Sequence, residues 1–329
     1  MNNAWPLPRH GRVAFAKGLA RLLLKMFISV GLVVIIVKST NVKGIGGRLL
    51  EVDIKAIVVA AVIMAALAIL PALRWTRLMR LGGRAFDVGT AYRLVVIGNF
   101  FGQVLPSISG DGVRAWYVYK LGIPLAISIS SVLLDRLTAL AALLLLAFLS
   151  LPWLWAIVPR QFAWWTIGLI VFGTMGGAVL LNGVSRLPKA WNRWRIIEAG
   201  KNLADSCYDL IINKQYLFQV IGLSLLVHLS VAVFVYALTK VVHVPARLED
   251  CLLLVPLVML VSMIPIGVAG WGIREGAMVV AFGFLNIPPS DALLVSILFG
   301  IIVALASSLG LFFWVTMGGV LKTRNQHAS

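Results

Sequence analysis

The stretch Ile127–Leu151 reads ISISSVLLDRLTALAALLLLAFLSL and decides the fold class of this chain. It is 25 residues long, and Asp135 and Arg136 are its only charged residues. An α-helix needs about 20 apolar residues to cross the hydrocarbon core of a bilayer. The stretch is uniformly apolar and does not alternate, which argues against a transmembrane β-strand. We therefore predict a membrane-spanning helix.

The rest of the chain repeats this pattern. Five further stretches are long and apolar enough to span: Leu19–Val37, Ile54–Leu73, Phe162–Leu181, Tyr216–Val241 and Ala292–Thr316. The whole chain is 60% hydrophobic and only 12% charged, where soluble proteins carry about 25% charged residues, so a water-soluble enzyme is excluded. The expected fold is an all-α polytopic membrane protein with about six full spans.

The net charge of +17 is concentrated between the apolar stretches. Three basic groups stand out: Arg9, Arg12, Lys17 and Arg21; Arg74, Arg77, Arg80 and Arg84; and Arg186, Lys189, Arg193, Arg195 and Lys201. The positive-inside rule places all three on the cytoplasmic side of the inner membrane. We expect a basic cytoplasmic N-terminus (1–18), one transmembrane domain (19–316) and a cytoplasmic tail (317–329). The partners are then anionic membrane lipids and no nucleic acid, and homo-oligomerisation is left open.

Two apolar regions are interrupted. Tyr92–Leu105 ends at Pro106 and a glycine-rich segment, and Cys251–Ile264 ends at Pro265 and another. If the second and third basic groups are both cytoplasmic, the chain between them crosses the membrane an even number of times, and the two full spans there already account for that. Residues 92–121 are therefore predicted to be a re-entrant hairpin. Tyr216–Val241 leads outward and Ala292–Thr316 returns to a cytoplasmic C-terminus with Lys322 and Arg324, so residues 251–289 are predicted to be a second hairpin that enters from the opposite face.

The two interruptions also share a sequence pattern. The first reads LPSISGDGVR (105–114) and the second IPIGVAGWGIRE (264–275), so both contain proline followed by G-x-G-(V/I)-R. Broken helices related by an inverted repeat are typical of transporters that bind their substrate near the middle of the membrane. Irregular backbone at that depth requires a polar cavity, and Gly110, Gly112, Gly270 and Gly272 would let the two loops approach closely.

Ionisable residues inside apolar segments are the main candidates for a binding site, because each is costly to bury unless it is paired or functional. The predicted phosphate-binding residues are Arg114, Arg136 and Arg274, with Asp111, Asp135 and Glu275 as charge-pairing or proton-coupling partners and Asn99 and Gln103 as hydrogen-bonding neighbours. Arginine suits phosphate because its planar fork donates two parallel hydrogen bonds. The alternative is that these charges only pair with one another and lock the hairpins in place. No metal or cofactor site is predicted.

These residues resemble the lysylphosphatidylglycerol synthase transmembrane region, a flippase-like integral membrane family that includes the membrane domain of multiple peptide resistance factors. The resemblance rests on NFFGQVLPSISGDGVR (99–114), on Asp135-Arg136 where the family has Glu-Arg, and on PIGVAGWGIRE (265–275). It implies a lipid-translocating domain that covers most of the chain. The aminoacyl-transferase domain of those factors has no counterpart here, so lysyl transfer is not expected.

The first hypothesis is therefore a lipid flippase or transporter for a phospholipid or polyprenyl-phosphate carrier, with no catalytic residue. The alternative is a membrane-embedded enzyme that modifies lipid phosphates or lipid-linked sugars and uses the same carboxylates as general acid and base. A scaffold subunit would explain the spans, but it would not explain two charged glycine-rich segments.

Overall fold

The computed structural model describes residues 45–104, 108–187, 194–263 and 271–326 of the chain, and every regular element in these ranges is an α-helix. The helices are α2 (Ile45–Leu50), α3 (Ile54–Leu67), α4 (Ile69–Leu81), α5 (Val88–Val104), α6 (Ile108–Lys120), α7 (Leu125–Ile157), α8 (Arg160–Ser185), α9 (Arg195–Ile212), α10 (Lys214–Val241), α11 (Leu248–Ser262), α12 (Ile273–Gly283) and α13 (Pro289–Gln326). The described part of the chain contains no strand, and the all-α prediction is confirmed there.

Five helical segments are long and apolar enough to cross a membrane: Ile54–Leu81, Leu125–Trp155, Arg160–Ser185, Lys214–Val241 and Pro289–Thr316. They correspond to five of the predicted spans. The sixth predicted span, Leu19–Val37, lies outside the described residues, as do the predicted N-terminal segment 1–18 and the last three residues of the tail. The chain is a multi-pass membrane protein.

The first described span continues beyond its predicted end. The prediction ended it at Leu73 and assigned Arg74 to a cytoplasmic basic loop, but the helix is interrupted only briefly at Ala68 and then continues to Leu81. Arg74 is 4% exposed in the middle of α4, so its assignment to the loop was wrong. The guanidinium can be buried within this helix because it pairs with a carboxylate on α7.

The first interrupted region forms a pair of helices, α5 and α6, and these pack antiparallel. Gly110 of α6 lies against the backbone of Gly98 and Gly102, and the side chain of Arg114, one turn later, also passes Gly98, so α6 runs back along α5. A methyl group on Gly110 would collide with the carbonyl oxygen of Gly98, so this close approach requires glycine. Pro106 and Ser107 lie outside the described residues.

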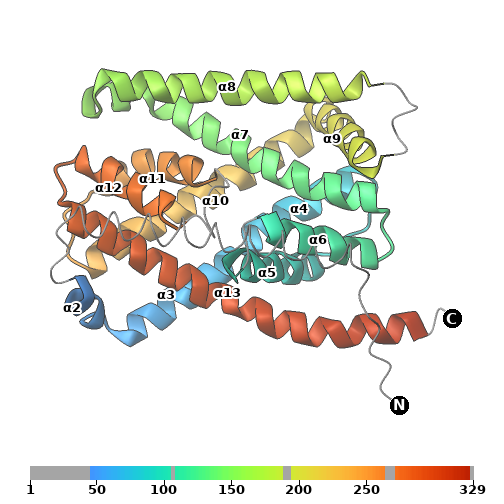
Figure 1. Cartoon of the computed structure of the whole chain (residues 1–329), viewed down its shortest axis with the longest axis horizontal. Coiled ribbons are helices and arrows are strands. Elements are labelled where there is room, and N and C mark those ends of the chain that lie inside the picture. The colour runs from blue at the N-terminus through green and yellow to red at the C-terminus, as the bar shows by residue number, and fades with distance from the viewer. Residues whose placement is uncertain (1–44, 105–107, 188–193, 264–270, 327–329) are drawn as a thin grey trace, which may run out of the picture.

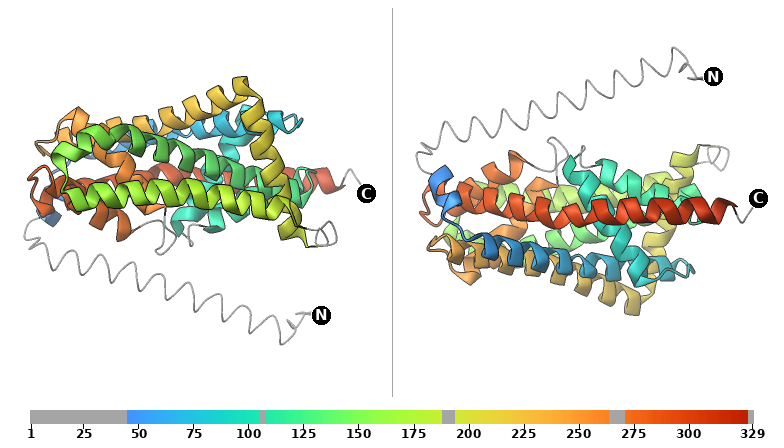
Figure 2. Two further views of the ribbon diagram at one scale, coloured as in Figure 1. Left: turned by 90° about the horizontal axis from the view of Figure 1, so that it is seen from above. Right: turned by 90° about the horizontal axis from the view of Figure 1, so that it is seen from below.

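The second interrupted region forms a similar pair, α11 and α12, which also pack against each other. Residues 264–270, which include Pro265 and Gly270, lie outside the described residues. The two pairs lie in opposite halves of the molecule, and α7 and α13 run past both of them (Figure 1). Viewed from below, α13 extends along the whole body (Figure 2).

The buried apolar side chains divide in the same way. One hydrophobic cluster joins α11 and α12 to α10 and α13, and a second joins α5 and α6 to α4. Each interrupted pair therefore has its own core. Helix α8 lies at the edge of the bundle (Figure 1), and none of its most apolar 18-residue window is buried, as expected for a helix that faces lipid.

Candidate functional site

Five charged side chains from three helices meet beside the first helix pair. They are Arg74 of α4, Asp111 and Arg114 of α6, and Asp135 and Arg136 of α7, and we refer to them as the arginine cluster. Asp111 and Arg114 are three residues apart at the start of α6 and therefore share one face of this helix. This face is turned to α7, where Asp111 pairs with Arg136 and Arg114 with Asp135. Four of the five were predicted as site residues from the sequence. Arg74 was missed.

The buried half of the arginine cluster is centred on Asp135. Arg74 Nε donates a hydrogen bond to Asp135 Oδ1 at 2.8 Å, and Arg114 Nη2 donates one to Asp135 Oδ2 at 3.0 Å. Arg74 Nη1 also donates to Ser224 Oγ of α10 at 3.3 Å. One carboxylate thus holds two guanidinium groups and ties α4, α6 and α7 together. Buried charges of this kind persist only when they are paired and hydrogen-bonded.

The more open half joins Asp111 to Arg136. Arg136 Nε and Nη2 each donate to the Asp111 carboxylate at 2.9 Å, so the pair is bidentate. The side chain of Arg136 is 50% exposed and that of Asp111 23%, whereas Arg74, Arg114 and Asp135 are 3–6% exposed. Arg114 Nη1 lies 3.7 Å from Asp111 Oδ1 and links the two halves.

The side chain of Arg114 is also held between the ring of Trp75 and the backbone of α5 at Gly98. Its guanidinium carbon lies 4.1 Å above the ring centroid of Trp75, a fully buried residue of α4. Its aliphatic part passes so close to Gly98 that a methyl group there would collide with it. Its Nε is buried without a hydrogen-bond partner in the described structure. Such an orphaned donor is uncommon in proteins and points to a further acceptor at this position.

Arg274 and Glu275 form a separate group at the start of α12. The Glu275 carboxylate accepts hydrogen bonds from Arg274 Nε at 3.1 Å, from Ser296 Oγ of α13 at 3.2 Å and from the backbone N–H of Gly272. Gly272 has φ of +87°, which favours glycine, and its N–H closes a hydrogen-bonded cap on the helix. Glu275 is fully buried and Arg274 is 5% exposed. The charge of each residue is offset by that of the other.

Arg114 and Arg274 share three local features. Each is buried against a carboxylate, each stacks on an indole ring (Trp75 or Trp271), and each passes closely by a glycine of a neighbouring helix (Gly98 or Gly300). Within the part of the chain that the structure describes, no hydrogen bond or ion pair joins the Arg274–Glu275 group to the arginine cluster. The structure thus brings together two of the three predicted phosphate-binding arginines, and places the third elsewhere.

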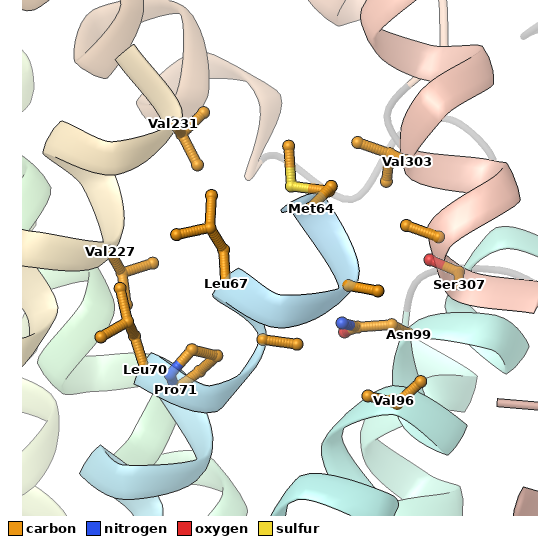
Figure 3. A pocket seen from close by; sticks show the side chains of 13 residues that line it. Met64, Leu67, Leu70, Pro71, Val96, Asn99, Val227, Val231, Val303 and Ser307 are labelled. Atoms are coloured by element: carbon orange, nitrogen blue, oxygen red, sulfur yellow. The ribbon is translucent and has the colours of Figure 1, made fainter. Parts of the chain in front are cut away.

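Asn99 borders an apolar cavity of about 140 Å³ between α3, α4, α5, α10 and α13 (Figure 3). Its amide and the hydroxyl of Ser307 are the polar groups there, among side chains such as Met64, Leu67 and Val231. Gln103 lies one turn further along α5 and does not line the cavity. Of the predicted glycines, Gly110 is buried at the α5 contact, Gly112 is exposed and Gly272 caps α12.

The ends of both interrupted pairs lie near the same part of α13. Gly300 contacts Arg274 and Trp271 at the start of α12, while Val303 and Ser307 border the cavity that Asn99 reaches from α5. The C-terminal half of α5 and the N-terminal turn of α12 therefore lie within about two turns of each other along α13.

A second cavity, of about 310 Å³, lies between α7, α8, α11 and α12. Its lining is apolar apart from the hydroxyl of Thr166. Among the described residues, no group of three or more His, Cys, Asp or Glu side chains could hold a metal ion. The polar chemistry of the described part is thus that of guanidinium–carboxylate pairs.

Comparison with known proteins agrees with these features. Residues 22–310 match the family described as the lysylphosphatidylglycerol synthase TM region. The chain is also similar to the UPF0104 membrane protein MJ1595 of Methanocaldococcus jannaschii, with 22% identity over 276 residues that cover 76% of this chain and 81% of that protein. No solved structure gives a significant match. Because the family match spans both interrupted pairs and all the described spans except the last residues of α13, the chain belongs to the lysylphosphatidylglycerol synthase transmembrane region family.

Proposed function

We propose that this protein is a lipid flippase or transporter that moves a phosphate-bearing lipid across the cytoplasmic membrane, and that the arginine cluster binds the lipid headgroup. The observation that carries the proposal is the excess of positive charge in that cluster. Three guanidinium groups face two carboxylates beside a membrane-spanning helix. An unbalanced charge at such a place is costly, and an anionic headgroup would neutralise it.

The chemistry of the cluster suits a phosphate. Guanidinium groups bind phosphate oxygens through parallel hydrogen bonds, and Arg136 presents such an edge on the more exposed side. The cluster also lies at the start of α6, where backbone N–H groups and the helix dipole favour an anion. The acyl or prenyl chains would remain in the bilayer while the headgroup occupies the polar site.

The architecture supports an inverted repeat with alternating access. Both interrupted pairs carry the G-x-G-(V/I)-R pattern, and both hold its arginine against an indole, a carboxylate and a glycine. We take the pairs to be re-entrant hairpins that enter from opposite faces. Rocking of one pair and its core against the other would expose the headgroup site to each side in turn.

The orientation follows from the remaining basic residues. Arg77, Arg80 and Arg84 lie at the end of α4 and in the following loop, at the end of the molecule that also carries α9 and the C-terminal end of α13 (Figure 1). The positive-inside rule then favours a cytoplasmic position for this end of the molecule, and the basic residues 9–21 of the sequence favour the same side for the N-terminus. No ATP-binding motif is present in the sequence. Transport would then be driven by an ion gradient or by downstream consumption of the lipid, or it would run without an energy source.

The experiment that tests this function uses purified protein in liposomes that contain labelled phospholipids or polyprenyl phosphates. Leaflet accessibility is followed over time for the wild type, for Arg136→Gln and for the matched control Arg247→Gln. Arg247 forms an exposed ion pair with Glu249, so the control removes an arginine and a salt bridge outside the cluster. We expect transport in the wild type and the control, and loss of transport in Arg136→Gln.

Absence of movement of every lipid tested, with folded protein, would refute the proposal. Chemical analysis of the lipids at the end of the assay separates transport from the enzymatic alternative, because an enzyme would leave modified lipid behind.

A further inference from the structure

We infer that Asp111 is a displaceable internal ligand of Arg136, and that it occupies the position where one phosphodiester group of a membrane lipid binds. This inference rests on the proposed function, because it assigns the headgroup to one half of the arginine cluster. Beyond that function, the inference says that the Asp111–Arg136 pair opens, that the pairs of Asp135 stay closed, and that the headgroup carries one negative charge.

The two halves of the cluster differ in how easily a headgroup can reach them. Asp135 and its two arginine partners are 3–6% exposed, and all three lie between packed helices. Arg136 is 50% exposed and Asp111 23%. Opening the buried half would leave unpaired charges in the protein interior. A headgroup can reach the more exposed pair and take the place of Asp111 at Arg136, so that this arginine keeps an anionic partner. The Asp111–Arg136 pair is therefore the one that opens.

The geometry of this pair matches that of a bound phosphate. Arg136 donates from Nε to Asp111 Oδ2 and from Nη2 to Asp111 Oδ1, each at 2.9 Å. Two oxygens of a phosphodiester can take the same two donors without rotation of the guanidinium group. Asp111 thus holds Arg136 in the orientation that the headgroup needs.

The charge of the cluster selects a monoanion. Arg74, Arg114 and Arg136 contribute three positive charges, and Asp111 and Asp135 two negative ones, so the sum is +1. One phosphodiester group brings the sum to zero. The buried Nε of Arg114 has no acceptor among the described residues, and Nη1 of the same side chain is 3.7 Å from Asp111 Oδ1. Arg114 thus also has unused donor capacity next to the exchange site.

The exchange has a structural consequence. Asp111 belongs to the first turn of α6 and Arg136 to α7, so the pair ties the interrupted region to the neighbouring span. When the headgroup takes over Arg136, this tie is released, while the Asp135 contacts still hold α4, α6 and α7 together. Release of this tie would free the first turn of α6 only when the headgroup is bound, while Arg114 keeps the rest of the helix against α7.

The test compares the two partners of this one ion pair. Binding of dioctanoyl phosphatidylglycerol to the full chain in detergent is measured by titration for the wild type, Asp111→Asn and Arg136→Gln, with Arg247→Gln as the control. Dioctanoylglycerol, which lacks the phosphate, controls for binding of the hydrocarbon chains. Asp111→Asn should bind phosphatidylglycerol about fivefold more tightly, because the competing carboxylate is gone, and Arg136→Gln about fivefold or more weakly. The control variant and the control lipid should show no such difference.

Opposite signs for the two partners are the decisive outcome. If Asp111 and Arg136 only stabilised the fold, both substitutions would weaken binding, or neither would change it, and either result would overturn the inference. Asp111→Ser and Arg136→Lys repeat the comparison if a first variant does not fold. Arg136→Lys should bind less tightly than the wild type because it keeps the charge and loses the fork.

Transport measured in parallel separates this inference from the proposed function. Opposite signs in binding without lipid movement by the wild type would remove the flippase proposal and leave the exchange intact. Lipid movement by the wild type together with equal effects of the two substitutions would remove the exchange and leave the flippase.

Discussion

Arg74 donates its Nε–H to Asp135 across 61 residues of sequence, and this 2.8 Å bond joins the first described span to α7. Both side chains are buried, and Asp135 also accepts from Arg114. A single carboxylate therefore holds three helices in register. The pair explains why α4 can carry an arginine in a buried position and continue as a helix.

Substitution of Asp135 by Asn should destabilise the protein strongly. It would leave Arg74 and Arg114 buried with a neutral partner, and loss of one member of a buried ion pair costs about 3–5 kcal/mol. Thermal unfolding in detergent measures the effect, with Asp53→Asn as a control because Asp53 caps α3 at an exposed position. The double variant Asp135→Asn/Arg74→Gln should lose less stability than the sum of the two single variants, because the residues are in direct contact. Additive losses would contradict the pairing.

The α5–α6 contact should not tolerate a side chain at Gly110. A methyl group there would collide with the carbonyl oxygen of Gly98 and lie 3.1 Å from the backbone nitrogen of Gly102. Backbone cannot move aside as a side chain can, so Gly110→Ala should cost about 1–3 kcal/mol. Gly102→Ala is the matched control, because a methyl group on Gly102 meets no atom within 4 Å. Equal melting temperatures for the two variants would show that α5 and α6 do not approach closely.

Re-entrant hairpins can be tested by chemical accessibility. Single cysteines replace Arg84, just before α5, and Lys120, the last residue of α6, and likewise Glu249 near the start of α11 and Gly283 at the end of α12. These variants are made in a protein in which the two native cysteines, Cys207 and Cys251, are replaced, because both are free thiols. A membrane-impermeant maleimide added outside intact cells should spare Arg84→Cys and Lys120→Cys, and should label Glu249→Cys and Gly283→Cys. If only one of the two cysteines at the ends of a helix pair were labelled, that helix pair would cross the membrane and would not be a re-entrant hairpin.

The start of α5 should show a pH-dependent contribution to stability. Asp87 accepts a hydrogen bond from the backbone N–H of Thr90 at 2.9 Å, and hydrogen bonds from Thr90 lower the pKa of this carboxyl below its ordinary value of 3.8. A lowered pKa means that the stabilisation is complete above the ordinary value and is lost as the pH falls through the lowered one. Asp87→Ala should therefore reduce the free energy of unfolding by about 0.5–2 kcal/mol at neutral pH.

The same comparison at acid pH checks the cause. The difference in melting temperature between the wild type and Asp87→Ala should stay constant at neutral and weakly acidic pH and shrink below about pH 4, where Asp87 takes up a proton. A difference that does not change over the whole range would mean that the carboxylate does not act as a helix cap.

The sequence alone located the five described spans and the two places where an apolar region is interrupted. Uninterrupted apolar segments leave a bilayer-spanning helix as the favoured structure, and Ile127–Leu151 lies within α7. Pro106 and Pro265 with their glycines stop regular helices, and the described helices end close to both, at Val104 and Ser262. Asp135-Arg136 within an apolar stretch was likewise enough to identify candidate site residues.

Only the tertiary structure decided which charges meet. Arg74 precedes three further arginines, so charge counting places it in a loop, and its burial depends on Asp135, which is distant in sequence. Arg274 was predicted to bind the same phosphate as Arg114, because the two glycine-rich loops of an inverted repeat were expected to meet near the middle of the membrane. It pairs with Glu275, the next residue, and with Ser296 of α13. Hydropathy and local pattern reflect the cost of burying each residue by itself. Packing decides which partner offsets this cost: a carboxylate of another helix for Arg74, and the neighbouring carboxylate for Arg274.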